Sequence, residues 1–592
     1  MVRKFVPLWL GFCACLPVGV WADDATNRGL PSIPSEAVAF LYAPTVKGLD
    51  GAYKGLLNDL GLQPFVPPPS RSIIGLIGQY LPMFEGIDEA GTLALVLMPF
   101  DPSEQVDSKL ALIIPAKDPK SMLKALGGQA GEGAEWAINL MGQPAVALIR
   151  GQSLVISKSA DVAKAINQSK TAMSEKLPAA ELAAFKDMNV ALWINAEQIF
   201  KVYKSTIDTF VAMMMMMTQG SESALERRSS EINKKTIDSF VDGARSLNIG
   251  LGYPKGGLAL RGTTTYKPGS DLAKQWKLKS TSDPLLRGVP AGKYMVAFGQ
   301  NVHPEQTRAA LRNMDPFFEA VLETEGIDKD MAKQLRSYLE EWTLLATAMS
   351  GSVEVLPPGE EGLLGLSVVL KTTDSKRWLE IASQVVELSK KFVVGMPNNL
   401  VDDDLKPLTK ALTYSSEAED IEGTKIGHLK FDLAKIDELE ADDLQDVLKI
   451  IGKEGALFRL GAIDGQTIVV SFGGGSKGMS RLIGTSKKKA APLENDPGIK
   501  NVASRLPEKR ASVFYVALDN IVDAIQQTLK AVDEEPLPLQ ISNLNAPLLL
   551  ATAGEDGWGQ LDVFVPTKLL VAVKNASMIL MGSMQNAERQ EN

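Results

Sequence analysis

The sequence predicts an α+β protein made of two related halves, each with an antiparallel-rich sheet, helices packed on one face and an inserted helical hairpin. Three observations lead to this fold class. The 592 residues are 45% hydrophobic and 22% charged, an ordinary globular composition with enough length for several cores. Strand-like segments occur both as hairpins and interleaved with helices. Four blocks of strand and helix then occur twice, in the same order.

The first matched blocks are residues 110–126 and 365–382. Each contains a β-branched apolar strand, a short turn, an aspartate and an amphipathic helix. We expect Asp118 and Asp374 to be the N-caps, and Pro119 occupies a preferred first helical position. The same strand-to-helix unit is therefore predicted in both halves.

The second matched blocks, residues 151–166 and 465–483, differ in their turn. Both open with Gly-Gln and a five-residue strand that ends in serine, and a second serine is expected to cap a helix. The capping serine is Ser159 in the first copy and Ser476 in the second. One residue separates the two serines in the first copy and four, Phe472–Gly475, in the second. A wider, glycine-rich turn is therefore predicted only in the second half.

Two further pairs of blocks follow in the same order. Residues 189–207 and 511–529 each predict a strand that leads into a helix with apolar residues three and four apart. Residues 248–266 and 547–565 each predict two strands joined by a glycine-rich turn. Four matched blocks in matched order predict a tandem duplication.

The two halves differ mainly in their helical insertions, expected at 196–217 with 222–247 in the first and at 304–349 in the second. A segment with two prolines separates the halves. The predicted divisions are a signal peptide at 1–22, a polar lead-in at 23–34, the first half at 35–279, a linker at 280–291, the second half at 292–584 and a polar tail at 585–592.

The N-terminus has the pattern of a secretory signal peptide. Arg3 and Lys4 precede an almost wholly apolar run at 5–20, and small Ala22 offers a cleavage point. The sequence therefore predicts export to a periplasm, cell envelope or extracellular space, most simply in a bacterium. Retention of the segment as an uncleaved anchor is the alternative, although the run is short for a membrane span.

Composition narrows the chemistry of the mature chain. Its only cysteines, Cys13 and Cys15, lie inside the predicted signal peptide, so cleavage would leave no disulfide, thiolate nucleophile or cysteine metal ligand. The formal net charge is −9, whereas nucleic-acid binding normally requires a basic surface. We expect no nucleic-acid partner, and no transmembrane span after signal cleavage.

The glycine-rich turn invites a nucleotide-binding interpretation. Gly473, Gly475 and Gly478 match the G-x-G-x-x-G spacing of dinucleotide sites. However, the next strand is expected only near Ala511, so the required strand–helix–strand unit is missing. A P-loop would need lysine where Met479 stands. We therefore expect no cofactor here, and interpret the glycines as backbone freedom for a wide turn.

Histidines and acidic clusters provide little catalytic potential. His303 is expected at a helix start and His428 in a strand. Residues 402–404 and 438–446 are acidic and could bind calcium loosely, but they are more simply solvated helix starts. A hydrolase that works with two carboxylates remains an alternative, although no pair of acids is marked out. No catalytic or metal-binding residue is predicted.

An unusual methionine run is the one candidate contact site. Five consecutive methionines cover more than one helix face, and methionine suits adaptable apolar binding surfaces. A helix buried between neighbours is the alternative. The candidate residues for contact with a protein or an apolar ligand are Met213, Met214, Met215, Met216 and Met217.

The segments "GQSLVIS" and "GQTIVVS" with their following helices resemble exported bacterial proteins of a domain-of-unknown-function family. The resemblance implies neither an activity nor functional residues. The sequence therefore predicts a non-enzymatic exported protein that acts by binding or as a structural module. The alternatives are a carrier or sensor of an apolar ligand and the carboxylate-based hydrolase.

Overall fold

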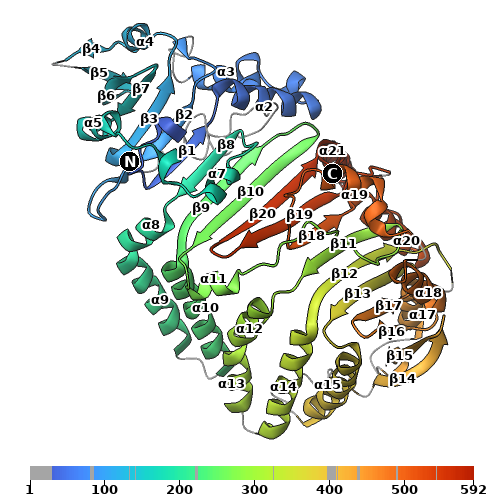
Figure 1. Cartoon of the computed structure of the whole chain (residues 1–592). Helices are drawn as coiled ribbons and strands as arrows, with labels where there is room; N and C mark the ends of the chain where they lie inside the picture. Colours follow the sequence, from blue (N-terminus) through green and yellow to red (C-terminus); the bar gives the residue numbers. More distant parts are fainter. Residues whose placement is uncertain are drawn as a thin grey trace. The chain divides into compact units, whose positions relative to one another are not determined.

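Helices and antiparallel strands alternate along the chain, which confirms the α+β class (Figure 1). This computed structural model describes residues 30–591 except 80–85, 132–133, 141, 220–223, 324–325, 360, 396–408, 410, 436–440, 489–490, 540 and 542. It divides into two compact units. Unit 1 takes the chain to Phe210, Val241–Lys267 and Gln560–Val571, and unit 2 takes Val211–Phe240, Pro268–Gly559 and Ala572–Asn592. The sequence-based boundaries stay a prediction.

Unit 1 contains an antiparallel sheet of ten strands in the order β4-β5-β6-β7-β3-β2-β1-β8-β9-β10. β20 (Trp558–Pro566) also pairs with β10. The ten strands are β1 (Ala39–Ala43), β2 (Leu93–Leu97), β3 (Leu110–Pro115), β4 (Gln129–Ala130), β5 (Glu135–Leu140), β6 (Gln143–Arg150), β7 (Ser153–Ser157), β8 (Val190–Ile194), β9 (Ala244–Gly252) and β10 (Gly257–Tyr266).

Unit 2 contains an antiparallel sheet in the order β14-β15-β16-β17-β13-β12-β11-β18-β19. Its strands are β11 (Tyr294–Asn301), β12 (Ala346–Val355), β13 (Leu364–Thr372), β14 (Leu412–Ile421), β15 (Thr424–Phe431), β16 (Ala456–Asp464), β17 (Thr467–Phe472), β18 (Ser512–Val516) and β19 (Leu548–Glu555).

The two sheets share one topology. If the strands of each unit are numbered in chain order, the nine strands of unit 2 lie side by side in the same order as β1–β9 of unit 1.

The helices connect these strands. They are α2 (Val46–Asp59), α3 (Ile73–Gly78), α4 (Pro119–Ala125), α5 (Ala160–Gln168), α6 (Met173–Lys176), α7 (Ala179–Ala184), α8 (Ala196–Val202), α9 (Lys204–Gln219), α10 (Ala224–Gly243), α11 (Asp271–Gln275), α12 (Pro304–Asn313), α13 (Asp315–Glu323), α14 (Lys329–Leu345), α15 (Ser375–Gly395), α17 (Ala441–Ile451), α18 (Gly475–Ser486), α19 (Pro497–Ala503), α20 (Leu518–Ala531) and α21 (Thr567–Glu591). None of the described helices combines the length and apolar composition that a membrane-spanning helix requires.

Two helical insertions end earlier than predicted. The helix expected to reach residue 247 ends at Gly243, because alternate residues of β9 are buried in the sheet. The helical pair expected to reach residue 349 ends at Leu345, where β12 begins between β11 and β13. Short apolar runs do not distinguish helix from strand without knowledge of the neighbouring strands.

Helices cover both faces of the unit 2 sheet, which corrects the prediction of helices on one face. Val369 and Val469 pack against α18, whose Met479, Leu482 and Ile483 are fully buried. The adjacent residues Leu370 and Ile468 point to the opposite face and pack with Trp378 of α15. β13 and β17 are apolar without alternation, which is the pattern of strands buried on both sides.

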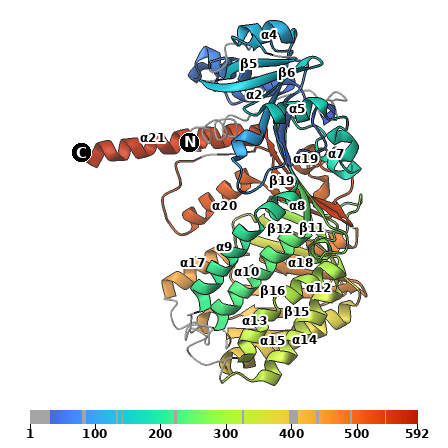
Figure 2. The same ribbon diagram turned by 90° about the vertical axis from the view of Figure 1, so that its left-hand side faces the viewer.

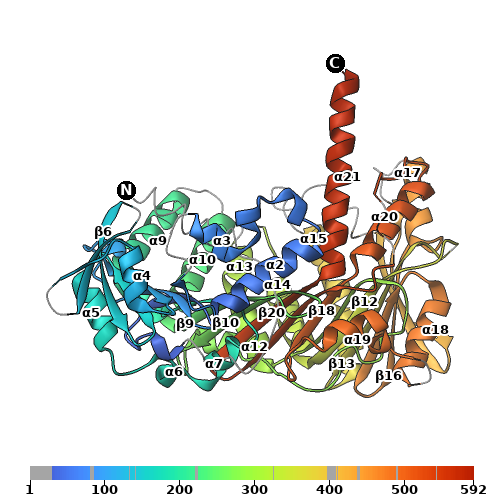
Figure 3. The same cartoon turned by 90° about the horizontal axis from the view of Figure 1, so that it is seen from above.

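On that second face α14 and α15 lie side by side (Figure 2). The rings of Trp342 and Trp378 are 4.8 Å apart between centroids, and Arg377 forms two hydrogen bonds with Glu341, of 2.7 and 2.8 Å. α17 and α20 form another neighbouring pair (Figure 3).

Unit 1 has the same two-faced arrangement. Ile113 and Val155 pack with α5, and Ile114 and Leu154 pack with Leu123 of α4. Three of the four predicted N-caps are confirmed: Asp118 accepts a hydrogen bond from the Lys120 amide, Ser159 from the Val162 amide and Asp374 from the Arg377 amide. The matched sequence blocks therefore fold into matched strand-to-helix units.

Candidate functional site

The wide turn after β17 consists of three consecutive glycines in the left-handed region. Gly473, Gly474 and Gly475 have φ angles of 65°, 68° and 57°. α18 begins at Gly475 with Gly474 as its N-cap residue, so the prediction that Ser476 caps the helix is wrong. Ser476 lies inside the first turn, and its hydroxyl donates a hydrogen bond of 3.1 Å to Glu419 Oε2.

This turn lies against the connection between β12 and β13. A Cβ atom on Gly473 would lie 2.1 Å from the Leu364 carbonyl oxygen, a separation that no side chain allows. The Gly474 amide donates to the Glu361 carbonyl oxygen at 3.2 Å. The same connection also contacts the end of α17, where the Leu363 amide donates a hydrogen bond of 2.7 Å to the Ile450 carbonyl oxygen. The turn therefore holds the β12–β13 connection in place.

Two carboxylates of the protein occupy the surroundings of the α18 N-terminus. A Cβ atom on Gly475 would lie 3.4 Å from Glu361 Oε1, which also lies 3.6 Å from Lys477 Nζ. The Glu419 carboxylate accepts the Ser476 hydroxyl. A helix N-terminus attracts anions through its free amides and dipole. Here Glu361 and Glu419 supply that negative charge, so the turn has a structural explanation that needs no bound phosphate.

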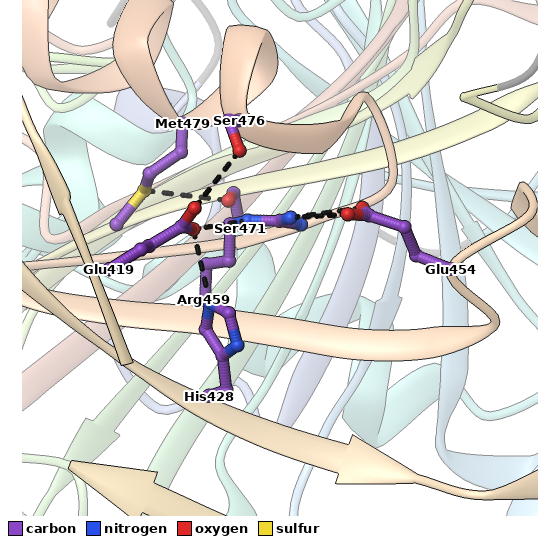
Figure 4. Close-up of polar contacts among 7 residues, drawn as sticks. All are labelled: Glu419, His428, Glu454, Arg459, Ser471, Ser476 and Met479. Atoms are coloured by element: carbon purple, nitrogen blue, oxygen red, sulfur yellow. Dashed lines mark hydrogen bonds and ion pairs between the residues drawn. The ribbon is translucent and has the colours of Figure 1, made fainter. Parts of the chain in front are cut away.

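Glu419 belongs to a polar cluster around a buried arginine (Figure 4). The side chain of Arg459 on β16 is 3% exposed. Its Nε lies 2.7 Å from Glu419 Oε1, and one terminal nitrogen lies 2.8 and 3.0 Å from the two oxygens of Glu454. His428 on β15 completes the cluster, with Nε2 3.0 Å from Glu419 Oε1. Two carboxylates therefore neutralise a guanidinium that is shielded from water.

The cluster perturbs the acid–base behaviour of its members. Burial alone raises the pKa of Glu419, but the hydrogen bonds with His428 and Arg459 outweigh it, so the pKa lies below the usual range. Burial likewise opposes the charge on Arg459, and Glu454 and Glu419 reverse this and raise its pKa. The cluster therefore holds Glu419 ionised and Arg459 charged.

Glu419→Gln is expected to lower stability at pH 7 and to change the acid limb of the unfolding curve. A carboxylate whose pKa is lower in the folded than in the unfolded protein stabilises the fold at any pH above its unfolded-state pKa. This stabilisation is lost as the pH falls through the pKa that the group has in the folded protein. The difference between wild type and variant should shrink between about pH 5 and about pH 3. Urea midpoints measured at stepwise pH test this. A difference that stays constant across that range would contradict the role of the ionised carboxylate.

The order of groups in the cluster does not suit nucleophilic catalysis. A serine nucleophile needs a base that accepts its proton, with the carboxylate behind the histidine. Here the carboxylate of Glu419 lies between Ser476 and His428 and contacts both. Ser471 donates to the Met479 sulfur at 3.4 Å. The other histidine, His303, accepts from the Glu305 amide at the exposed start of α12, as its sequence position predicted.

A pocket of about 370 Å³ lies at the start of the β12–β13 connection. Five segments of unit 2 form it: the approach to β11, the end of β12, the start of the connection, the middle of α18 and the second half of α20. Its lining residues are Lys293, Glu354, Val355, Leu356, Pro357, Arg481 and Gln527.

Most polar groups of this pocket are paired. The Glu354 side chain is 3% exposed; it pairs with Arg481 through Oε2, and Oε1 accepts from the Ser352 hydroxyl at 3.0 Å. Lys293 pairs with Asp523 at its rim. One amide is paired on one side only. Gln527 Nε2 donates to Asp523 at 2.5 Å, but Oε1 is buried and accepts no hydrogen bond from any described residue. A buried acceptor without a donor costs about 1–3 kcal/mol.

Sequence reasoning missed the pocket, because its residues are spread over five segments. Arg481 and Gln527 lie in matched blocks, but the patterns of those blocks do not mark either residue. Glu354 carried the clearest signal. It is an acid at the end of an apolar strand, where burial requires a partner. The partner Arg481 lies more than a hundred residues away, so the pairing could not be inferred from spacing.

The candidate contact methionines stay a prediction. Met213 and Met216 on α9 are 51% and 66% exposed, whereas Met214 and Met215 are half-buried. The side chain of Met217 lies outside the described residues. Residues 402–404 and 438–440 also lie outside them, and Asp446 pairs with Lys449 at 2.8 Å. Within the described ranges, no three acidic, histidine or cysteine side chains come together as a metal site.

No protein-family model matches the chain, and no curated protein matches it. Among solved structures, crystal forms I, III and IV of TP0453 are similar over 50% of this chain and 96 to 98% of theirs. Their sequence identity is 10 to 11% and their TM-score 0.19. Similarity at this level carries no argument about fold or function.

Proposed function

We propose that the protein is a non-enzymatic exported protein that works by binding, and that the pocket of unit 2 is its binding site. The carrying observation is a pocket of ligand size whose lining includes Gln527, a residue whose Oε1 is buried and has no donor among the described residues. Natural folds normally satisfy such atoms. A ligand toward which this amide turns, and which donates a hydrogen bond to Oε1, would remove the penalty. This favours binding over a purely structural role.

The difference between the two units supports this assignment. We propose that they arose by tandem duplication, in line with their shared strand order. In unit 1 the turn after β7 is short and Ser159 caps α5 directly. In unit 2 the corresponding turn is wider and holds the connection that supplies Leu356 and Pro357 to the pocket. The added turn residues and the pocket therefore occur in the same copy.

Gln527→Leu is expected to weaken binding about tenfold, the value of one buried hydrogen bond. The free protein should stay folded, with stability within about 1 kcal/mol of wild type, because the lost bond to Asp523 offsets the removed unpaired acceptor. Native mass spectrometry of protein purified from its own host, followed by thermal-shift measurements with the released compound, provides the readout. Lys530→Met, on the exposed side of α20, is the matched control. A ligand-free mass and no thermal shift with any small molecule would overturn the proposed function.

Export is a separate part of the proposal, and it rests on the sequence of residues 1–22. N-terminal sequencing of the protein recovered from outside the cytoplasm is expected to begin at Asp23. A start at Met1 would show that the segment is retained, and recovery only from the cytoplasm would refute export.

A further inference from the structure

We infer that the pocket recognises an α-carboxylate with an adjacent N–H donor and an apolar side chain, the chemistry of an apolar amino acid or of the last residue of a peptide. This inference rests on the proposed function, because it names the ligand class of the same pocket. Three features carry it: free cationic donors, the unpaired acceptor and an apolar wall.

The cationic donors come from Arg481 and Lys293. Glu354 engages one terminal nitrogen of Arg481, and among the described residues nothing accepts a hydrogen bond from its Nε or its other terminal nitrogen. The side chain is 39% exposed, so these donors are accessible. The ammonium of Lys293 uses one of its three N–H groups on Asp523. Charged donors of this kind bind carboxylates through short, strong hydrogen bonds.

The backbone leaves these donors uncovered. Gly292 passes close to the ion pair, and a Cβ atom there would lie 3.1 Å from Glu354 Oε2 and 3.5 Å from the second terminal nitrogen of Arg481. A side chain at this position would crowd the Glu354 carboxylate and contact the guanidinium, so glycine leaves space beside the ion pair.

The acceptor has a fixed orientation. The Asp523 carboxylate pairs with the Lys293 ammonium and acts as a hydrogen-bond acceptor, so the amide of Gln527 turns Nε2 toward it. Oε1 is then the unpaired atom. It needs an N–H or O–H group on the ligand, and an N–H next to the carboxylate has the chemistry to satisfy it.

The remaining wall is apolar and suits a small side chain. Val355, Leu356 and Pro357 follow one another at the end of β12 and in the connection. The volume of about 370 Å³ lies at the low end of ligand sites, which suits one amino-acid-sized group. The positive charges of Lys293 and Arg481 are matched by the negative charges of Glu354 and Asp523, so these four residues leave the pocket with no net charge.

Titration calorimetry of the signal-less chain can test each feature with four compounds: N-acetyl-L-leucine, N-acetyl-L-leucinamide, 4-methylpentanoate and L-leucine. N-acetyl-L-leucine is expected to bind with a Kd of about 1 mM or tighter, given the usual affinity per atom. The amide lacks the carboxylate, and 4-methylpentanoate lacks the N–H. Each should bind about tenfold more weakly, the value of one charge-assisted or buried hydrogen bond. L-leucine distinguishes a free amino acid from the last residue of a peptide as the natural ligand. If L-leucine binds more tightly than N-acetyl-L-leucine, the ligand is a free amino acid.

Variants assign the contacts to residues. Lys293→Met is expected to weaken N-acetyl-L-leucine about tenfold and leave the leucinamide unchanged. Gln527→Leu should remove the preference for the N–H. Lys530→Met serves as control and should change neither. Equal binding of acid and amide, with no effect of Lys293→Met, would overturn the carboxylate inference while the pocket remained a site. Absence of binding by all four compounds would overturn it too, whereas the host-ligand measurement decides the proposed function separately.

Discussion

Arg459→Met is expected to lower the free energy of unfolding of unit 2 by about 3 kcal/mol, the lower end of the range for breaking a buried ion pair. The lower end applies because the Glu419 and Glu454 side chains are 25% and 44% exposed and can regain some water. The loss arises mainly from two carboxylates left close together without their cation, and not from lost packing. Urea denaturation followed by circular dichroism measures it.

Arg287→Met is the matched control. Arg287 pairs with Asp283, and these side chains are 51% and 64% exposed. A surface pair of this kind contributes about 0–1 kcal/mol. If both arginine variants had the same small effect, Arg459 would not be the centre of a buried network.

Gly473→Ala is expected to destabilise unit 2 by about 2–5 kcal/mol and to weaken ligand binding at the pocket. An alanine in the left-handed region costs about 1–2 kcal/mol, and displacing packed neighbours adds about 1–3 kcal/mol. Here the added Cβ would meet the Leu364 carbonyl at 2.1 Å, and a backbone atom cannot rotate away as a side chain can. Since the β12–β13 connection must shift, Leu356 and Pro357 should move with it.

Gly465→Ala provides the comparison. Gly465 lies in the neighbouring β16–β17 turn, and a Cβ atom there would meet nothing within 4 Å. That variant should be neutral or slightly more stable, because alanine restricts the unfolded chain. Equal effects of the two substitutions on stability, or unchanged ligand affinity in Gly473→Ala, would show that the wide turn does not support the pocket.

The sequence predicted the fold through local signals that repeat. The strands around Leu110 and Gly365, their aspartate caps and the capping serine of the first copy all lie where the patterns placed them. Such features depend on residues a few positions apart. The placement of helices on both sheet faces was mispredicted, because an apolar strand without alternation, such as β17, does not reveal which neighbour covers each side.

The site could be predicted only in part. The glycines marked the turn, but the residues it touches, Glu361 and Leu364, lie about a hundred positions earlier in the chain. Ser476 looked like a cap because serine near a helix start usually is one. With three left-handed glycines before it, the helix has its N-cap at Gly474, two residues earlier than predicted, and Ser476 is free to contact Glu419. Long-range pairing of this kind has no signature in a single sequence.

Anomalous diffraction from crystals of the signal-less chain soaked with N-acetyl-L-selenomethionine tests the central claim most directly. The compound has the proposed carboxylate, N–H and apolar side chain, and its selenium can be located independently of the protein. The expected result is a selenium peak in contact with Leu356 and Pro357, with the carboxylate on Arg481 or Lys293 and the N–H on Gln527 Oε1. Selenium found only elsewhere, or nowhere at a concentration that saturates binding in solution, would contradict the pocket as the binding site.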